Sequence, residues 1–360
     1  MNLTQSLSET RQNFMKWWRG EDFGRPLFNL SSRTRSKPGS EPDYDGYVRR
    51  LDAERRYRRL KLVYDSGTLY GDTLPFAGIS MGVGCMAAFL GCEPVFAEDT
   101  TWMNPIIGEG AGLASLGKLK YDPDNYWWKE HVRETGKLAE LCRGDGYVVT
   151  IPDILENIDV LALLCGSQSM CYYLMDEPAL IREYIGQIDN LYFEYYDRIY
   201  DLIKDSGGGN GSLFSIWSEK RTLKIQCDVA VLLSPAQFDS LVMPSLEKQL
   251  TRIDYSLYHL DGPDAIKYLD SILSLKKLKA LQFTPGDGNP PPEDERWYPI
   301  YDKVRKAGKS LWVYLGGDDL INGSRKLVER YGTAGVYLLY HDQDDEFAKK
   351  LSDAAYNAFR

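Results

Sequence analysis

The sequence predicts an α/β chain that closes into one (β/α)8 barrel, a single domain spanning residues 1–360 with a helical N-terminal extension. Three observations support this: a length of 360 residues, eight strand-like apolar segments mostly followed by helical patterns, and polar residues where those segments end. Two smaller domains would also fit the length. The structural alternative is an open doubly wound sheet, which would normally show a clearer glycine fingerprint after its first strand.

The elements follow from local patterns. Phe14, Trp17 and Trp18 recur at helical spacing within an entry helix of about residues 8–19. A second, much longer helix is expected from Pro178 to about Asp205. Residues 78–84 are glycine-rich and predict a close-packed loop, while residues 96–107 and 207–217 also predict loops. The expected strands are centred near residues 27, 66, 149, 225, 256, 281, 313 and 338.

Composition limits the possible partners. Hydrophobic residues make up 43 % and charged residues 26 % of the chain, which is typical of a globular protein. The net charge of −9 argues against binding to nucleic acid or to an anionic membrane surface. Neither an apolar signal-peptide core nor a run of 18 apolar residues occurs, so a cytoplasmic protein is expected.

The stretch around His259 carries the strongest indication of chemistry. Residues Ile253–Leu257 predict a strand that runs into His259, Asp261 and Gly262, before a helix begins at Pro263. Because side chains two apart on extended backbone point the same way, His259 and Asp261 are expected to lie together. The alternative is structural: a capping aspartate and a surface histidine beside a turn.

Several other strand ends carry polar residues. In a barrel these positions meet at one mouth, where neighbouring carboxylates raise one another's pKa and one can stay protonated as an acid. His259 and Asp261 could also ligate a divalent metal, with Asp72 or Asp228 as the third ligand. The residues expected at the mouth are Arg33, Arg35, Asp72, Glu156, Asn157, Asp228, His259, Asp261, Gln282, Thr284, Tyr314 and His341.

Two further features remain open from the residues alone. Arg33 and Arg35 could grip a carboxylate or phosphate, although a solvated basic loop explains them equally well. The chain has six cysteines without a C-x-x-C pair, so we expect small buried thiols rather than a zinc site built on several thiolates.

The order of the motifs resembles the uroporphyrinogen decarboxylase superfamily, whose (β/α)8 barrels include the tetrapyrrole decarboxylase and corrinoid-dependent methyltransferases. No single motif is decisive, but together they span nearly the whole chain. The matching segments are Gly71–Pro75, Gly82–Gly91, Glu98–Trp102, Leu174–Pro178, Gln226–Asp228, Leu233–Phe238 with Pro244, Tyr258–Gly262 and Gly316–Gly317.

The resemblance implies roles for particular residues. Asp72 stands at the decarboxylase's catalytic aspartate, and His341 at its substrate-contacting histidine. The family's methyltransferases bind zinc through His-x-Cys and a later cysteine; His259 matches the histidine, whereas Asp261 replaces the first cysteine. An oxygen-rich metal site and a metal-free acid/base site therefore both remain open.

These observations lead to three expectations about function. The first is methyl-group transfer on a small molecule, with zinc or another divalent metal and a corrinoid protein as partner. The second is decarboxylation of a tetrapyrrole (a porphyrin-type lyase reaction) or of another acid, using Asp72 and an arginine without a cofactor. The third is a barrel that binds a small molecule without catalysis. The expected catalytic residues are Asp72, His259, Asp261 and His341, and the expected substrate contacts are Arg33, Arg35, Glu156, Asp228, Gln282 and Tyr314.

Overall fold

The computed structural model describes residues 1–33, 51–97, 100–108 and 110–360. Its centre is an eight-stranded sheet in the order β1-β3-β2-β14-β13-β12-β11-β10. Six of the eight predicted strands, the five from residue 225 onward and the one near residue 27, lie in this sheet as parallel neighbours. The strands of the sheet are β1 (Asn2–Leu3), β2 (Leu27–Arg33), β3 (Gly67–Gly71), β10 (Thr222–Ile225), β11 (Tyr255–Asp261), β12 (Ala280–Thr284), β13 (Ser310–Leu315) and β14 (Val336–Tyr340).

The remaining strands form three small pairs. These are β4 (Phe76–Ala77) with β7 (Val148–Val149), β5 (Glu93–Phe96) with β6 (Thr101–Asn104), and β8 (Asn210–Ser212) with β9 (Ile216–Ser218). The β4–β7 pair is parallel. Thr150, the residue after β7, forms an isolated bridge with Gly211 of β8. Among the described residues the paired strands do not run round a complete ring, so the molecule is a mixed α/β fold with a largely parallel central sheet.

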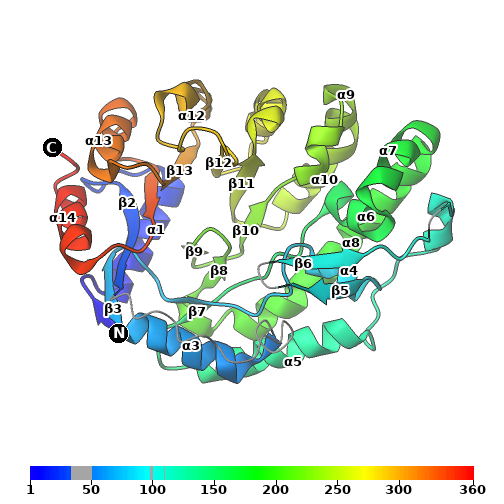
Figure 1. Ribbon diagram of the computed structural model, residues 1–360, viewed down its shortest axis with the longest axis horizontal. Coiled ribbons are helices and arrows are strands. Elements are labelled where there is room, and N and C mark those ends of the chain that lie inside the picture. Colours follow the sequence, from blue (N-terminus) through cyan, green and yellow to red (C-terminus); the bar gives the residue numbers. More distant parts are fainter. Residues whose placement is uncertain (34–50, 98–99, 109) are drawn as a thin grey trace.

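Helices cover the outside of the curved sheet (Figure 1). Most strands of the parallel part of the sheet are followed by a helix, as the sequence predicted. The main helices are α1 (Leu7–Arg19), α3 (Ala53–Asp65), α4 (Cys85–Phe89), α5 (Tyr126–Leu141), α6 (Asn157–Cys165), α7 (Ser167–Asp176), α8 (Pro178–Ile203), α9 (Pro235–Gln237), α10 (Met243–Leu250), α11 (Leu269–Ser274), α12 (Tyr298–Lys306), α13 (Leu320–Tyr331) and α14 (Asp345–Tyr356).

Two segments expected as loops are β-hairpins. Residues 93–104 form the β5–β6 hairpin, and residues 210–218 form the β8–β9 hairpin. In Figure 1 the β8–β9 hairpin lies inside the arc of strands. Its tip has left-handed backbone at Phe214 (φ 63°) and Ser215 (φ 52°), a conformation that is uncommon for residues other than glycine. Trp312 Nε1 donates to the Phe214 carbonyl at 2.9 Å, which fixes this tip to β13.

The strand near residue 66 differs from the prediction in direction. β3 pairs antiparallel with β2, so Gly71 at its end lies beside Asn29 near the start of β2. Gly71 has φ +59°, and a Cβ there would lie 2.3 Å from the Phe28 ring, so the chain can turn here only with glycine. A strand was correctly expected here, although it begins only at Gly67, after helix α3 has ended at Asp65. The pattern that predicts a strand carries no information about its direction.

Helix α1 covers the end at which the parallel strands begin. Ser6 caps its first turn and Gly20 ends it in left-handed conformation. Trp17 Nε1 donates to the Leu311 carbonyl at the start of β13, and the Trp18 ring packs 5.6 Å from Tyr255, the first residue of β11. These rings belong to one buried cluster with side chains of β9 and of the central strands. The entry helix is therefore part of the core.

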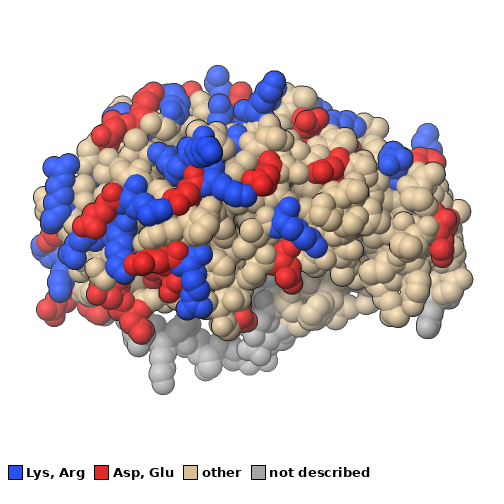
Figure 2. Space-filling view, turned by 90° about the horizontal axis from the view of Figure 1, so that it is seen from above, with Lys and Arg blue, Asp and Glu red and all other residues tan. Residues whose placement is uncertain are grey.

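The outer surface carries charges of both signs. On the face drawn in Figure 2, coloured Lys and Arg side chains are interspersed with Asp and Glu. Among the described residues no single helix is both long and apolar enough to cross a membrane; only α6 and α7 together meet that test, and they meet at a bend of 110°.

Candidate functional site

Asp228, His259 and Asp261 lie together where β10 and β11 end. Ile225 pairs with Tyr258, so the two aspartates, each three residues further on, come level with one another. One ligand atom from each of the three side chains lies within 4.8 Å of the other two, and we call these three residues the metal-ligand group. One nitrogen and two carboxylate oxygens form a donor set that suits a divalent cation such as zinc. The sequence predicted this grouping, with Asp228 as one of two candidates for the third position.

A second layer of side chains orients His259. The Gln282 side-chain oxygen bonds His259 Nδ1, and Gln282 Nε2 donates to Thr284 Oγ1 at 2.8 Å. An amide oxygen only accepts hydrogen bonds, so His259 Nδ1 is the donor in this contact and Nε2 is the ring nitrogen available to a metal. Metal-ligating histidines are commonly held in this way. Gln282, predicted as a substrate contact, instead lies 2 % exposed beneath the histidine.

Asp228 has one bonded and one free oxygen. Gln226 Nε2 donates to Asp228 Oδ2, and the side-chain Oε1 of Gln226 accepts from Lys224 Nζ, which also donates to Asp153 at 2.9 Å. Asp228 Oδ1 is buried and has no hydrogen-bond partner among the described residues. Burial raises the pKa of Asp228, while His259 and Lys224 act against that rise. A buried carboxylate oxygen without a partner is costly unless a ligand occupies the position.

Two buried carboxyl groups support the turn that carries Asp228. Glu156 Oε1 accepts from the Gln226 backbone N–H at 2.6 Å, and burial raises its pKa well above the usual range. Asp159 accepts from the backbone N–H groups of Asp228 and Val229 at 2.8 and 2.9 Å. Burial, followed by the Asp228 charge, raises the pKa of Asp159. Glu156, predicted to contact substrate, is thus a buried support, and Asp159 was missed by the sequence analysis.

Tyr314 and His341 meet at the same end of the sheet, further along the rim. The Tyr314 hydroxyl bonds the His341 ring, and their ring centroids are 4.5 Å apart. His341 is exposed and Tyr314 half-buried. At the tip of the β8–β9 hairpin, the Phe214 ring packs 4.9 Å from His259 and 5.4 Å from Trp312, and the Trp312 ring stacks on Tyr314. Both groups lie at the end of the sheet where the parallel strands finish; that they share one pocket stays a prediction.

Asp72 does not lie at that mouth. Its carboxylate is fully buried and bonded to Arg25 at 2.5 Å and to Asn13 of α1 at 2.8 Å. It also accepts from the backbone N–H of Phe28, at the start of β2. Asp72 thus occupies the opposite end of the strands from His259, because β3 runs antiparallel to β2. The expectation that Asp72 joins His259 in one pocket is wrong.

The two predicted arginine contacts are not placed. Arg35 lies outside the described residues, and Arg33 is described only as the last backbone position of β2.

Asn157, also expected at the mouth, is buried, and its side chain donates to the backbone carbonyl of Gln226 at 3.4 Å.

The cysteines have no part in the metal-ligand group. All six are free, and only Cys171 is exposed. Burial raises the pKa of Cys227, the one thiol beside the group, well above its usual value. Asp228, His259 and Asp261 are the one cluster of three or more potential ligands among the described residues. As the sequence suggested, this donor set contains no thiolate.

The comparisons with known proteins give a fold and no family. No family model and no curated protein matches the chain. Among solved structures, a methyltransferase from Methanosarcina mazei superposes with a TM-score of 0.55 over 97 % of this chain and 98 % of the other. The two sequences are 12 % identical, so the likeness extends to the fold alone.

Proposed function

We propose that the chain is an enzyme that transfers a methyl group to or from a small molecule, using a divalent metal held by Asp228, His259 and Asp261. The observation that carries the proposal is the convergence of these three side chains, with the buried Asp228 Oδ1 left without a partner. Full-length likeness to a methyltransferase supports the choice of reaction. The resemblance to the uroporphyrinogen decarboxylase superfamily, and a corrinoid protein as partner, belong to the same proposal.

The residues of this chain would divide the work. Asp228, His259 and Asp261 would hold the metal, while Gln282 keeps the proton on His259 Nδ1 so that Nε2 stays free. A bound metal supplies positive charge that lowers the pKa of a thiol, alcohol or water beside it. His341, which bonds Tyr314, would accept a proton from the substrate. Phe214 would restrict water on the inner side of His259.

We also propose that the sheet closes into a (β/α)8 barrel. The bridge between Thr150 and Gly211 connects β7 to β8, and the Thr222 backbone N–H donates to Asn210 Oδ1 at 2.8 Å, connecting β8 to β10. At the other edge, the Asp72 backbone N–H donates to the Phe28 carbonyl at 2.8 Å. These links support closure with short strands β4, β7 and β8. An experimental structure in which β7 and β8 separate would contradict it.

The metal and the reaction are tested separately. Purified protein is analysed for bound metal by mass spectrometry and titrated with Zn²⁺ by calorimetry. Asp228→Asn, His259→Gln and Asp261→Asn should each weaken binding by about a hundredfold or more, since loss of an outer-layer partner alone costs 10- to 100-fold. Asp264→Asn is the matched control, an exposed aspartate three residues beyond Asp261 and outside the group. Equal binding by all four variants would contradict the metal site.

Methyl transfer is then followed with methylcobalamin and a panel of thiols, by loss of the cobalt–methyl absorption and by mass spectrometry of the product. We expect turnover that depends on added metal and is lost with His259→Gln. Metal binding without turnover across the panel would favour a non-catalytic binding protein. The decarboxylase alternative required Asp72 in the pocket, and its burial against Arg25 removes the support for that route.

A further inference from the structure

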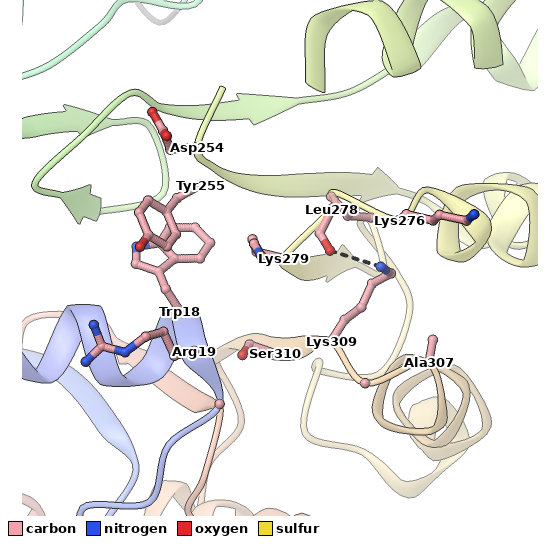
Figure 3. Close-up of a pocket in the computed structure, with 12 residues that line it drawn as sticks. Trp18, Arg19, Asp254, Tyr255, Lys276, Leu278, Lys279, Ala307, Lys309 and Ser310 are labelled. Carbon is pink, nitrogen blue, oxygen red and sulfur yellow. Dashed lines mark hydrogen bonds between the residues drawn. The ribbon is translucent and has the colours of Figure 1, made fainter. Parts of the chain in front are cut away.

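A cavity lies at the end of the sheet opposite to the metal-ligand group. It has a volume of about 350 Å³ and is bounded by the end of α1, the start of β11, and the loops that precede β12 and β13. Figure 3 shows Trp18 and Tyr255 forming one wall, with Lys309 across the cavity and Lys279 between them in this view. The volume is at the lower end of the range for small-molecule sites. Nothing in the proposed reaction uses this space.

The charge of the cavity is opposite to that of the chain. Four basic side chains line it against a single carboxylate, that of Asp254, although the whole chain carries −9. Arg19 is compensated by Glu21 at 2.6 Å, and Figure 3 shows Arg19 and Lys276 at opposite margins. Lys279 and Lys309 are the two cations that remain near the centre.

Lys309 is the least expected of these groups. It is only 6 % exposed, and its ammonium donates to the backbone carbonyls of Leu275 and Leu278, both at 2.9 Å. No carboxylate among the described residues forms a salt bridge with it. Burial, and then the charge of Lys279, lowers the pKa of Lys309. Two cations that repel each other in a cavity without an acid between them form a site that an anion would stabilise.

The aromatic wall adds a second preference. Tyr255 is half-buried at the cavity, and its ring lies 5.6 Å from that of Trp18. Flat ring faces of this kind favour planar apolar groups. A free phosphate would fill only part of a 350 Å³ space, so a larger molecule with a planar portion fits better.

We propose that this cavity binds a small organic anion, with its oxyanion head between Lys279 and Lys309 and its planar part against Tyr255. The site is separate from the metal-ligand group and independent of the proposed methyl transfer. Two structural elements connect the cavity to the metal-ligand group. Strand β11 runs from Tyr255 to Asp261, and Trp18 Nε1 donates to the carbonyl of Trp217 in the β8–β9 hairpin at 2.8 Å.

The test uses phenyl phosphate, inorganic phosphate and phenol as probes, titrated into the full-length protein by calorimetry at constant ionic strength. We expect saturable binding of phenyl phosphate, weaker binding of phosphate, and none of phenol. Lys279→Ala should weaken phenyl phosphate binding about tenfold or more, the expected scale for one charge-assisted hydrogen bond. Lys277→Ala is the matched control, an exposed neighbour that does not line the cavity.

Lys309→Met adds a second variant, because Lys309 also bonds the carbonyls at the end of α11. If Lys309 is purely structural, Lys309→Met lowers the melting temperature and leaves phenyl phosphate binding intact, which contradicts its role at the anion. Absence of saturable binding, or equal loss with Lys277→Ala and Lys279→Ala, would overturn the site. Equal affinity for phosphate and phenyl phosphate would overturn the role of Tyr255.

Discussion

The two ends of the central strands differ in how completely their polar groups are satisfied. At the end where the strands begin, the carboxylate of Asp72 is buried and bonded to Arg25, Asn13 and Gln5. At the end where they finish, Asp228 and His259 are oriented by neighbours and lie within 4.8 Å of each other, and Asp228 Oδ1 has no hydrogen-bond partner among the described residues. Satisfied polar groups stabilise a fold, whereas oriented groups without partners are available to a ligand. This difference distinguishes Asp72 from Asp228, which the sequence offered as equal candidates for the third metal ligand.

The largest effect is expected from Asp72→Ala. This substitution leaves the Arg25 guanidinium buried without its counter-charge, which costs about 3–5 kcal/mol for a buried pair. We expect the free energy of unfolding, measured in urea, to fall by that amount while the zinc affinity of the folded protein is unchanged. An Asp72→Ala variant of full stability that has lost metal binding would reverse the roles of the two ends.

The buried histidine His131 predicts how the stability of the fold depends on pH. His131 on α5 is fully buried, and burial lowers its pKa to about 4. Its folded pKa lies below the unfolded value of about 6.5, so the unfolded chain binds the extra proton first as pH falls. His131 therefore contributes its full stability above pH 6.5 and loses it between about pH 6.5 and 4, a change of about 3 kcal/mol.

This contribution is measured as a difference between two unfolding curves. Wild type and His131→Leu are unfolded in urea at a series of pH values, and the gap between their free energies of unfolding should narrow toward pH 4 and be constant above pH 7. His341→Leu is the control, because that histidine is exposed and its ring bonds the Tyr314 hydroxyl. A pH-independent gap for His131→Leu would show that burial does not hold this ring neutral.

The sequence predicted the candidate site better than it predicted its surroundings. His259 and Asp261 were placed by strand periodicity, and the parallel register of β10 and β11 brought Asp228 to them. Asp72 was misplaced because periodicity identifies a strand but not its direction. Asp159 was missed because it sits in the apolar helix α6, where a lone carboxyl gives no pattern until its backbone partners, 69 and 70 residues away along the chain, are known.

The β8–β9 hairpin shows a second kind of limit. Its strands are three residues each, shorter than most strands and too short for a clear alternation. Residues 207–211 are rich in glycine and indicated a loop, yet Ile216 and Trp217 are buried in the cluster under α1. The contacts that stabilise this hairpin come from Trp18 and Trp312, which are distant in sequence. Local propensity could not supply them.

The smallest effects on zinc affinity are expected from Gln282 and Thr284, the residues that orient His259 without binding the metal. Gln282→Ala removes the acceptor of His259 Nδ1 without removing a ligand, so zinc affinity should fall by about 10- to 100-fold. Thr284→Val removes only the group that fixes the Gln282 amide, so this variant should lose less zinc affinity than Gln282→Ala. The order His259→Gln, Gln282→Ala, Thr284→Val should therefore run from the largest loss of affinity to the smallest in calorimetric titrations.

Gln282→Glu sharpens this series further. A carboxylate still accepts from His259 Nδ1 but no longer donates to Thr284 Oγ1, so orientation of the ring is retained while the amide donor is lost. We expect most of the zinc affinity lost with Gln282→Ala to return with Gln282→Glu. If Gln282→Glu binds zinc no better than Gln282→Ala, acceptance from His259 Nδ1 is not the way in which residue 282 supports the metal.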